Sequence, residues 1–403
     1  MTSYKVTTTK SWFERAKNSF GGIIIGIIFL IIGTILLWWN EGNFVKTQAA
    51  LKEAQSVTRE LGNIDQVDSS LGGQLVHATG PANTEDRLED PFFGVSTNAI
   101  RLERTVEYYQ WEEEKKTERK KKLGGGEEEV TTYTYSQKWV NRPVDSTRFA
   151  APGASEQHKN FVYSQLEDLT VQAKNVTVGA YRLPAFLIES IRSPESFQVE
   201  LSDEVLTKLN EQLAPWLSPP SPPDSPATLV HVSDNTVYIG PHPASPGVAD
   251  TRITFKQTLP TTVSFIAKLV GDTFETYVSK NGRSVSMLSV GTHSAENMYE
   301  SAHTANTIMT WILRFVGVFL VCISLVLITA PLSVLASIIP FLGSIVGAGT
   351  ALFSLLFGLA WSLLIIAIAW LFYRPLIGII LLMAVVALVA MLYSKGQTAK
   401  NEK

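Results

Sequence analysis

The chain has 403 residues with 34 basic and 37 acidic side chains, and its formal net charge is −3. This even balance gives no support to a nucleic-acid-binding protein. The single cysteine, Cys322, excludes an intrachain disulfide, so any large domain must be stabilised by its own core. Hydrophobic residues make up 45% of the chain and concentrate at its two ends.

The first apolar segment covers residues 20–39 and carries no charge. Twenty such residues are enough to cross the roughly 30 Å hydrocarbon core of a bilayer as a helix. Trp38 and Trp39 close the segment, where aromatic rings favour the interface. A cleaved signal peptide is the alternative, but the run is longer than the usual apolar region and no A-x-A site follows it. We therefore predict an uncleaved signal anchor.

Three more spans are predicted in the C-terminal part, over residues 311–330, 344–373 and 376–393. Arg374 and Pro375 separate the last two, because a charge is costly inside the membrane and proline disfavours helix before it. Pro331 and Pro340 delimit a short apolar stretch. A re-entrant helix over 331–343, and with it a fourth C-terminal span, is left open.

The basic residues that flank these spans predict the orientation. Four of them precede the first span, Lys5, Lys10, Arg15 and Lys17, and three follow the last, Lys395, Lys400 and Lys403. By the positive-inside rule, segments 1–19 and 394–403 are cytosolic. Four crossings then place residues 40–310 outside the cytosol.

Glycines recur at four-residue spacing within the apolar segments. Gly22, Gly26 and Gly33 share one face of the first span, and Gly343 and Gly347 repeat the spacing near the third. Small residues let helix backbones approach closely in lipid. We expect these faces to pack helices, either within one chain or between copies; the alternative is that glycine is simply frequent in membrane helices.

Residues 40–310 read as a strand-rich domain of mixed α+β class. Strand signals occur at 101–111, 130–139, 169–183, 228–239, 251–255 and 262–269. Ser202 is a good N-cap for a helix that ends near Leu213. The proline-rich loop 219–226 separates two regions with a weak internal echo, Leu75-Val76-His77 and Leu229-Val230-His231. The echo suggests a duplicated β-unit around this loop.

Residues 112–129 carry a dense run of both charges around Gly124-Gly125-Gly126. We predict a long solvated hairpin tip, since only Leu123 there could fill a core. An anion-binding patch at Lys120-Lys121-Lys122 is the alternative, opposed by the neighbouring glutamates.

The search for chemistry gives no catalytic, metal-binding or cofactor-binding prediction. The six histidines show no metal-ligand spacing, and no nucleophile elbow or P-loop occurs. A transporter is disfavoured, because transport paths usually need ionisable residues inside the spans, where the only charges are Arg314 and Arg374, both near predicted edges. Asn175-Val176-Thr177 is a glycosylation sequon on the predicted outer side, although such triplets also arise by chance.

Several segments in chain order resemble the transmembrane protein 43 (LUMA) family. They are Asn40-Glu41-Gly42, Leu75-Val76-His77, Val106-Glu107-Tyr108-Tyr109-Gln110-Trp111, Tyr133-Thr134-Tyr135 with Trp139, the strand and turn from Val176 to Ile188, and Trp370-Leu371-Phe372-Tyr373-Arg374-Pro375-Leu376. The resemblance implies four crossings, a large luminal loop and cytosolic ends. It also implies self-association in the endoplasmic reticulum and inner nuclear membrane, with lamin- and emerin-like partners only in an animal. A prokaryotic member would lie in the cytoplasmic membrane.

The sequence thus predicts a membrane protein with one N-terminal and three C-terminal transmembrane helices around a mixed α+β, strand-rich extracytoplasmic domain. We expect a homo-oligomeric scaffold that acts through membrane lipids and other membrane proteins and is not an enzyme. The alternative is an extracytoplasmic lipid- or envelope-binding protein, including a lipid-modifying enzyme, with Trp38, Trp39, Trp311, Trp370 and Arg374 as interface anchors.

Overall fold

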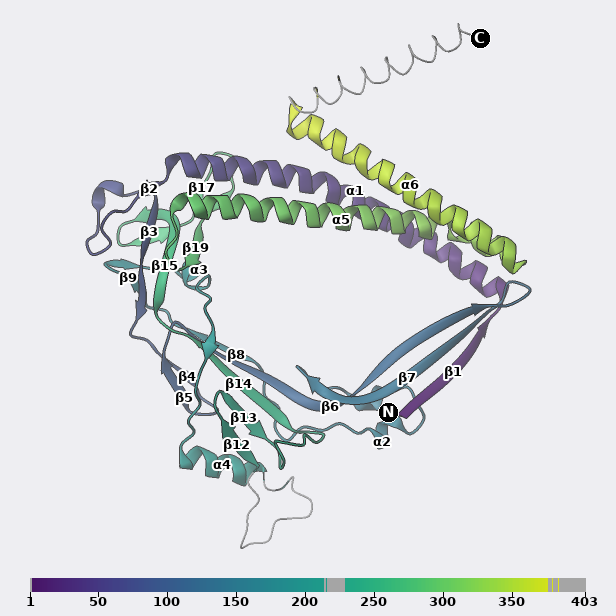
Figure 1. The fold of residues 1–403 in the computed structure, drawn as a ribbon, viewed down its shortest axis with the longest axis horizontal. Coiled ribbons are helices and arrows are strands. Elements are labelled where there is room, and N and C mark those ends of the chain that lie inside the picture. Colours follow the sequence, from purple (N-terminus) through teal and green to yellow (C-terminus); the bar gives the residue numbers. More distant parts are fainter. Residues whose placement is uncertain (1, 214, 216–228, 376–378, 380–382, 384–403) are drawn as a thin grey trace.

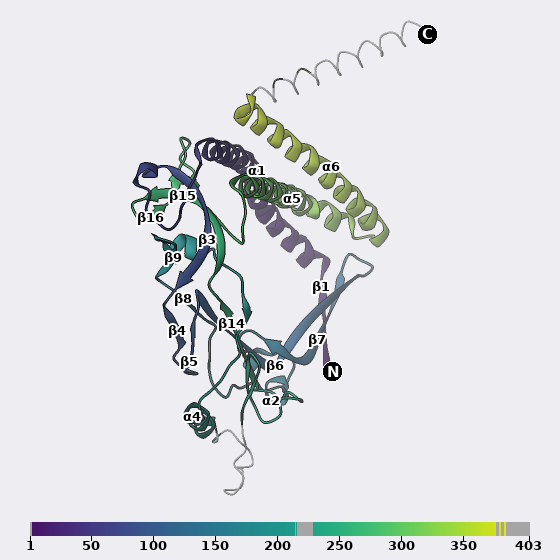
Figure 2. The same ribbon diagram turned by 60° about the vertical axis from the view of Figure 1, so that its left-hand side comes forward.

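Two very long helices run along one edge of the molecule. The computed structural model in Figure 1 describes residues 2–213, 215, 229–375, 379 and 383. Helix α1 (Trp12–Val57) lies beside α5 (Ala295–Ala336), and α6 (Pro340–Tyr373) packs against both. The two long helices stay adjacent when the molecule is turned (Figure 2). Most of the sheet domain lies near the C-terminal end of α1, and its strands within residues 101–140 reach toward the N-terminal end of that helix (Figure 1).

The described residues contain three helices that are long and apolar enough to cross a membrane: α1, α5 and α6. They confirm the predicted N-terminal and C-terminal apolar helices. The boundaries differ, because α1 continues for 18 residues past Trp39 and α5 begins 16 residues before Trp311. Pro331 lies inside α5, and only residues 337–339 separate α5 from α6, so the described part of 331–343 is not a separate re-entrant helix. Apart from Ile379 and Met383, the predicted span 376–393 and tail 394–403 lie outside the described residues.

The domain contains two main sheets. The eight-stranded sheet has the order β1-β7-β6-β14-β13-β12, with β8 also on β6 and β11 on β14. Its strands are β1 (Thr2–Lys10), β6 (Arg101–Lys121), β7 (Glu127–Val140), β8 (Leu169–Gln172), β11 (Glu195–Ser196), β12 (Val230–Ser233), β13 (Thr236–Ile239) and β14 (Thr251–Thr258).

The seven-stranded sheet has the order β10-β9-β3-β15-β16, with β19 also on β15 and β2 on β3. Its strands are β2 (Arg59–Glu60), β3 (Leu75–Thr84), β9 (Val176–Val178), β10 (Tyr181–Arg182), β15 (Thr261–Val270), β16 (Thr273–Glu275) and β19 (Met287–Val290). Two short pairs complete the strands, β4 (Arg87–Asp90) with β5 (Val95–Asn98) and β17 (Tyr277–Val278) with β18 (Ser284–Val285).

The shorter helices are α2 (Ala154–Gln157), α3 (Ala185–Ile188) and α4 (Asp203–Leu213), with 3-10 turns at Ser69–Leu71 and Ser146–Arg148. Helix α4 confirms the predicted helix, because the Ser202 hydroxyl accepts a hydrogen bond from the Val205 amide at 3.3 Å. The proline loop 219–226 lies outside the described residues. The duplication around it was a wrong interpretation: β3 lies inside the seven-stranded sheet, whereas β12 is the edge of the other.

The seven-stranded sheet joins the helices to the domain core. Successive side chains of a strand point to opposite faces, so β3 directs Val76 into the main core shared by both sheets and Leu75 to the other face. On β15, Phe265 likewise faces the main core and Ile266 faces the other side of the sheet. The second face packs against the outer parts of α1 and α5 through a separate core cluster of Ala50, Leu51, Ala54, Leu75, Ile266, Val285, Met298 and Tyr299.

The N-terminal segment differs most from the prediction. Residues 2–10, predicted as part of a separate cytosolic segment 1–19, form β1 and pair antiparallel with β7, from Thr2 opposite Tyr135 to Lys10 opposite Glu127. The β6–β7 hairpin extends from the rest of the domain toward the start of α1 (Figure 1). Its turn at 122–126 is shorter than the predicted tip 112–129, because both strands continue through the charged run. The turn also packs against the start of α1, since Arg15 donates a hydrogen bond to the Gly125 carbonyl oxygen and a Cβ added at Gly125 would meet the Trp12 side chain.

A bilayer around residues 20–39 would separate the two ends of α1. The paired β1 and a membrane-spanning α1 therefore exclude each other, since β7 belongs to the sheet domain at the far end of the span. In the structure as described, residues 2–10 and the domain share one sheet, which contradicts their predicted separation.

Candidate functional site

The glycine face of α1 packs against α5 of the same chain. A Cβ added at Gly26 would lie 2.8 Å from both the Ile328 side chain and the Ser324 carbonyl oxygen, and one at Gly33 would lie 3.0 Å from Val321. Gly22 is looser, with the nearest atom at 3.8 Å. Of the two readings left open, packing within one chain is therefore the one observed for these glycines.

Gly343 and Gly347 line the junction between α5 and α6. A Cβ at Gly343 would lie 2.6 Å from the Ser337 backbone, whereas the nearest atom to one at Gly347 is Ser333 Cβ at 3.7 Å. Sequence reasoning missed three further glycines with the same role: Gly42 against the Tyr373 ring, Gly317 against Leu37 and Gly358 against Cys322. Their signal was weak because none of them has another glycine three or four residues away.

A buried ion pair joins the three long helices just past the predicted end of the first span. Glu41 of α1 is fully buried, and its Oε1 lies 2.6 Å from Nε of Arg314 on α5. Its Oε2 accepts a hydrogen bond from Arg314 Nη2 at 2.9 Å and one from Trp370 Nε1 of α6 at 2.8 Å. The Arg314 guanidinium also lies over the ring of Trp311, 4.7 Å from its centroid. We call these four residues, Glu41, Arg314, Trp311 and Trp370, the boundary cluster.

The boundary cluster compensates one buried charge of each sign. A bidentate guanidinium–carboxylate pair is stronger and more directional than a neutral hydrogen bond. Removing only one partner would leave the other charge buried and uncompensated. Next to it, Asn40 donates to the Thr310 carbonyl oxygen at 3.0 Å, which adds a second polar link between α1 and α5. The arrangement holds three helices in one register, and it contains no group placed to react.

The predicted interface anchors come together around this cluster. Trp38 packs on the rings of Phe372 and Tyr373, with centroids 5.6 and 5.7 Å away. The Arg374 guanidinium lies over the rings of Phe44 and Trp370. Trp39 and Trp311 remain more than half exposed. Sequence reasoning placed these anchors but missed Glu41, although a carboxylate after one span and Arg314 near the start of another were a usable signal.

The loop of residues 277–283 holds the outer part of α1 through hydrogen bonds. Tyr277 donates to Glu53 at 2.8 Å, and the Lys280 amide also reaches this carboxylate. The Asn281 amide donates to the Lys46 carbonyl oxygen at 2.7 Å, and Arg283 bonds Asn43. Together with the second core cluster, these bonds fix the sheet domain to the helices.

Asn175 of the sequon is exposed, as an acceptor requires, but it is hydrogen-bonded. Its backbone and side-chain amides both donate to Asp86, at 2.8 and 3.0 Å. These bonds hold the pKa of Asp86 below its ordinary value. The site is thus accessible, and nothing in the structure shows that it is modified.

A buried acid lies in the domain core. Asp250 is almost fully buried, and its Oδ2 accepts hydrogen bonds from the Tyr238 hydroxyl and, at 2.8 Å, from the Gly247 amide. Its Oδ1 has no partner among the described residues. Burial raises the pKa of Asp250, although the Gly247 amide opposes the shift. Burial and the Asp250 carboxylate likewise raise the pKa of Tyr238.

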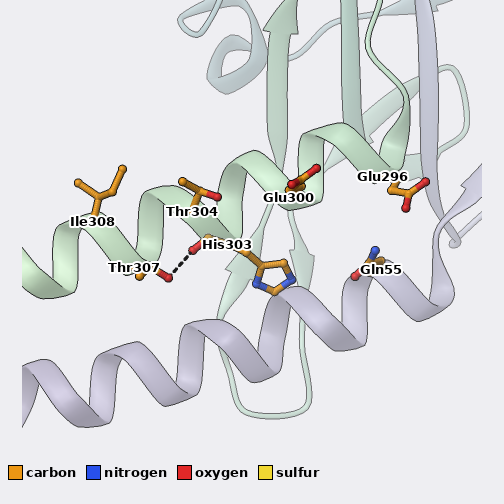
Figure 3. Close-up of a pocket in the computed structure, with 7 residues that line it drawn as sticks. All are labelled: Gln55, Glu296, Glu300, His303, Thr304, Thr307 and Ile308. Carbon is orange, nitrogen blue, oxygen red and sulfur yellow. Dashed lines mark hydrogen bonds between the residues drawn. The ribbon is translucent and has the colours of Figure 1, made fainter.

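A hollow of about 420 Å³ lies between the outer parts of α1 and α5 (Figure 3). Its polar residues do not converge on one point, because the His303 imidazole points toward α1 whereas Glu300 points away from it. Burial and the nearby Lys52 lower the pKa of His303. No group of three or more His, Cys, Asp or Glu side chains could hold a metal ion in the part of the chain that the structure describes.

Comparison with known proteins gives one consistent result. The family model described as Transmembrane protein 43 matches residues 108–375. The chain is 28% identical to Transmembrane protein 43 of Homo sapiens over 401 residues, covering 97% of this chain and 94% of that protein. It is 28% identical to the Mus musculus protein over 91% of this chain and 88% of that protein, and 27% identical to the Drosophila melanogaster homolog over 92% and 94%. No solved structure matches.

Proposed function

Since the chain belongs to the transmembrane protein 43 family and is an integral membrane protein, we propose that it is a non-catalytic membrane scaffold. The observation that carries this proposal is the way in which the sheet domain is fixed to the helices. Helix α1 continues without interruption from the predicted span into the second core cluster, and the boundary cluster ties it to α5 and α6. This rigid attachment would hold the surface of the sheet domain at a fixed position relative to the bilayer, where partners could bind it.

The proposed partners are membrane lipids, other membrane proteins and further copies of the chain. The covered glycine face of α1 cannot join copies while α5 occupies it. The exposed face of the same helix is the better candidate, since Ile24, Ile28, Ile31 and Ile35 follow one another at helical spacing and are about half exposed or more. Lamin- and emerin-like partners, and a location in the endoplasmic reticulum or inner nuclear membrane, remain predictions from the family resemblance.

In the membrane we propose cytosolic ends and a sheet domain on the other side. This requires β1 to leave β7 and the hairpin turn 122–126 to leave Trp12 and Arg15. The nine cross-strand pairs cost roughly 0.2–1 kcal/mol each, or less than about 10 kcal/mol, and the contacts of the turn add a few kcal/mol more. Large apolar side chains stand exposed along α1, α5 and α6, and at about 1 kcal/mol or more each their burial in lipid amounts to tens of kcal/mol. Insertion therefore outweighs the strand pairing.

The mass of the full chain in lipid nanodiscs, measured by light scattering, tests self-association. A discrete multimer is expected. Ile28→Trp together with Ile31→Trp should reduce it to a monomer, whereas Leu363→Trp, at an exposed position of α6, should not. A monomeric wild-type chain would contradict self-association, and a multimer insensitive to the isoleucine pair would contradict the proposed face.

A further inference from the structure

We propose that the hollow between Arg374 and Lys52 binds the headgroup phosphate of an anionic glycerophospholipid in the outer leaflet. The hollow has a volume of about 380 Å³ and is lined by Phe44, Val45, Gln48, Ala49, Lys52 and Arg374. It lies on the outer side of the boundary cluster, where α1 leaves the predicted span and α6 ends. This inference does not depend on the scaffold proposal.

The Arg374 guanidinium is held in place but not neutralised. It stacks on the Phe44 ring, 4.6 Å from the centroid, and lies 5.7 Å from that of Trp370. Among the described residues no carboxylate pairs with it, because the nearby Glu41 is committed to Arg314 and Trp370. A planar guanidinium with free donor groups is well suited to a phosphate.

Lys52 adds a second cation to the same hollow. It is exposed on α1 two turns beyond Phe44 and forms no ion pair with any described residue. Long basic side chains extend along apolar surface to place their charge at headgroup level. With Glu41 paired to Arg314, the hollow keeps two positive charges and has no acidic residue in its lining. This charge selects an anionic headgroup over a zwitterionic one.

The remaining lining favours a lipid over a free phosphate ion. Phe44, Val45 and Ala49 are apolar, and Phe44 and Val45 follow the end of the predicted span by five and six residues, about 8–9 Å along a helix, which is headgroup level. Both parts of a lipid are therefore matched, the phosphate by the cations and the upper acyl chain by the apolar residues.

Native mass spectrometry of the full chain in detergent tests the proposal, with phosphatidylglycerol and phosphatidylcholine as the added lipids. Phosphatidylglycerol should bind one copy per chain more tightly than phosphatidylcholine. Arg374→Gln and Lys52→Gln should each weaken its binding roughly five-fold, the usual contribution of one basic side chain near an anionic surface. Lys46→Gln is the matched control, since Lys46 is an exposed cation on another face of α1 and should leave binding within about two-fold.

Three results would overturn the proposal. They are equal binding of the two lipids, unchanged phosphatidylglycerol binding in the Arg374→Gln, Lys52→Gln double variant, and full displacement by inorganic phosphate, which would indicate a site for a free ion. Arg374→Lys separates charge from folding. It keeps the cation but not the planar, stacked fork of donors, so its loss of binding should be smaller than that of Arg374→Gln, and an equal loss would also contradict the assignment.

Discussion

Glu41 and Arg314 form a two-point ion pair across α1 and α5, with Oε1 2.6 Å from Nε and Oε2 2.9 Å from Nη2. The carboxylate is fully buried, and its third bond, from Trp370, brings α6 into the same contact. One acidic side chain thereby fixes the register of three long helices.

Replacing Glu41 alone should destabilise the chain strongly. Glu41→Gln leaves the Arg314 charge buried without its partner, and the free energy of unfolding should fall by about 3–5 kcal/mol. Denaturant-induced unfolding of the full chain in detergent measures this loss.

The double variant Glu41→Leu, Arg314→Met is the control for this prediction. It removes both charges, so it should cost much less than either single change, and the coupling energy should be large. Additive losses would show that the two side chains act independently.

A large side chain at a glycine of α1 that packs against α5 should lower the stability of the chain. Gly26→Leu forces atoms into Ile328 and the Ser324 carbonyl oxygen and should cost about 1–3 kcal/mol or more. Gly21→Leu is the matched control on the same helix, because nothing lies within 4 Å of its Cβ position. Thermal unfolding of the purified variants compares them, and equal melting temperatures would contradict the packing described here.

Asp250 should make stability depend on pH. Burial raises its pKa in the folded state above the ordinary value of 3.8. Between those two values the folded chain holds a proton that the unfolded chain has released, so stability is fully present below the ordinary pKa and falls as pH rises through the raised one. The amide side chain of the Asp250→Asn variant does not titrate, so this variant lacks the pH dependence that Asp250 gives to the wild type.

The difference in unfolding free energy between wild type and Asp250→Asn should therefore change as pH rises from about 4 through the raised pKa of Asp250, with wild type losing more as pH rises. A constant difference across this range would rule out the raised pKa.

The apolar helices, the domain strands and the cap at Ser202 could be predicted because each rests on local pattern. The helix that packs on the glycine face could not be predicted. A four-residue spacing shows that the residues of a helix face are small, but it does not show which element covers them. Glu41 was hidden because its ion pair joins residues 273 positions apart. The β1 segment had a local signal, Val6 followed directly by three threonines, but its basic residues were weighed only as topology determinants.

The strand β1 should separate from β7 when α1 crosses a bilayer. In a Cys322→Ser background, Thr7→Cys and Val130→Cys occupy paired positions of the two strands. In nanodiscs no disulfide should form between them, because the membrane lies between the two sites. Efficient cross-linking in the bilayer would show that β1 remains paired and that α1 does not span.

The sheet domain and the long helices form one rigid unit, and the distribution of distances between them in nanodiscs measures this rigidity. Spin labels at Glu275→Cys on β16 and Ile312→Cys on α5, in the Cys322→Ser background, report this distance by double electron–electron resonance. We expect a single narrow distribution, as narrow as that of a control pair within α5, Glu300→Cys with Ile312→Cys. A broad or multiple distribution for the first pair alone would show that the domain moves freely on its anchor and that the two parts are not one unit.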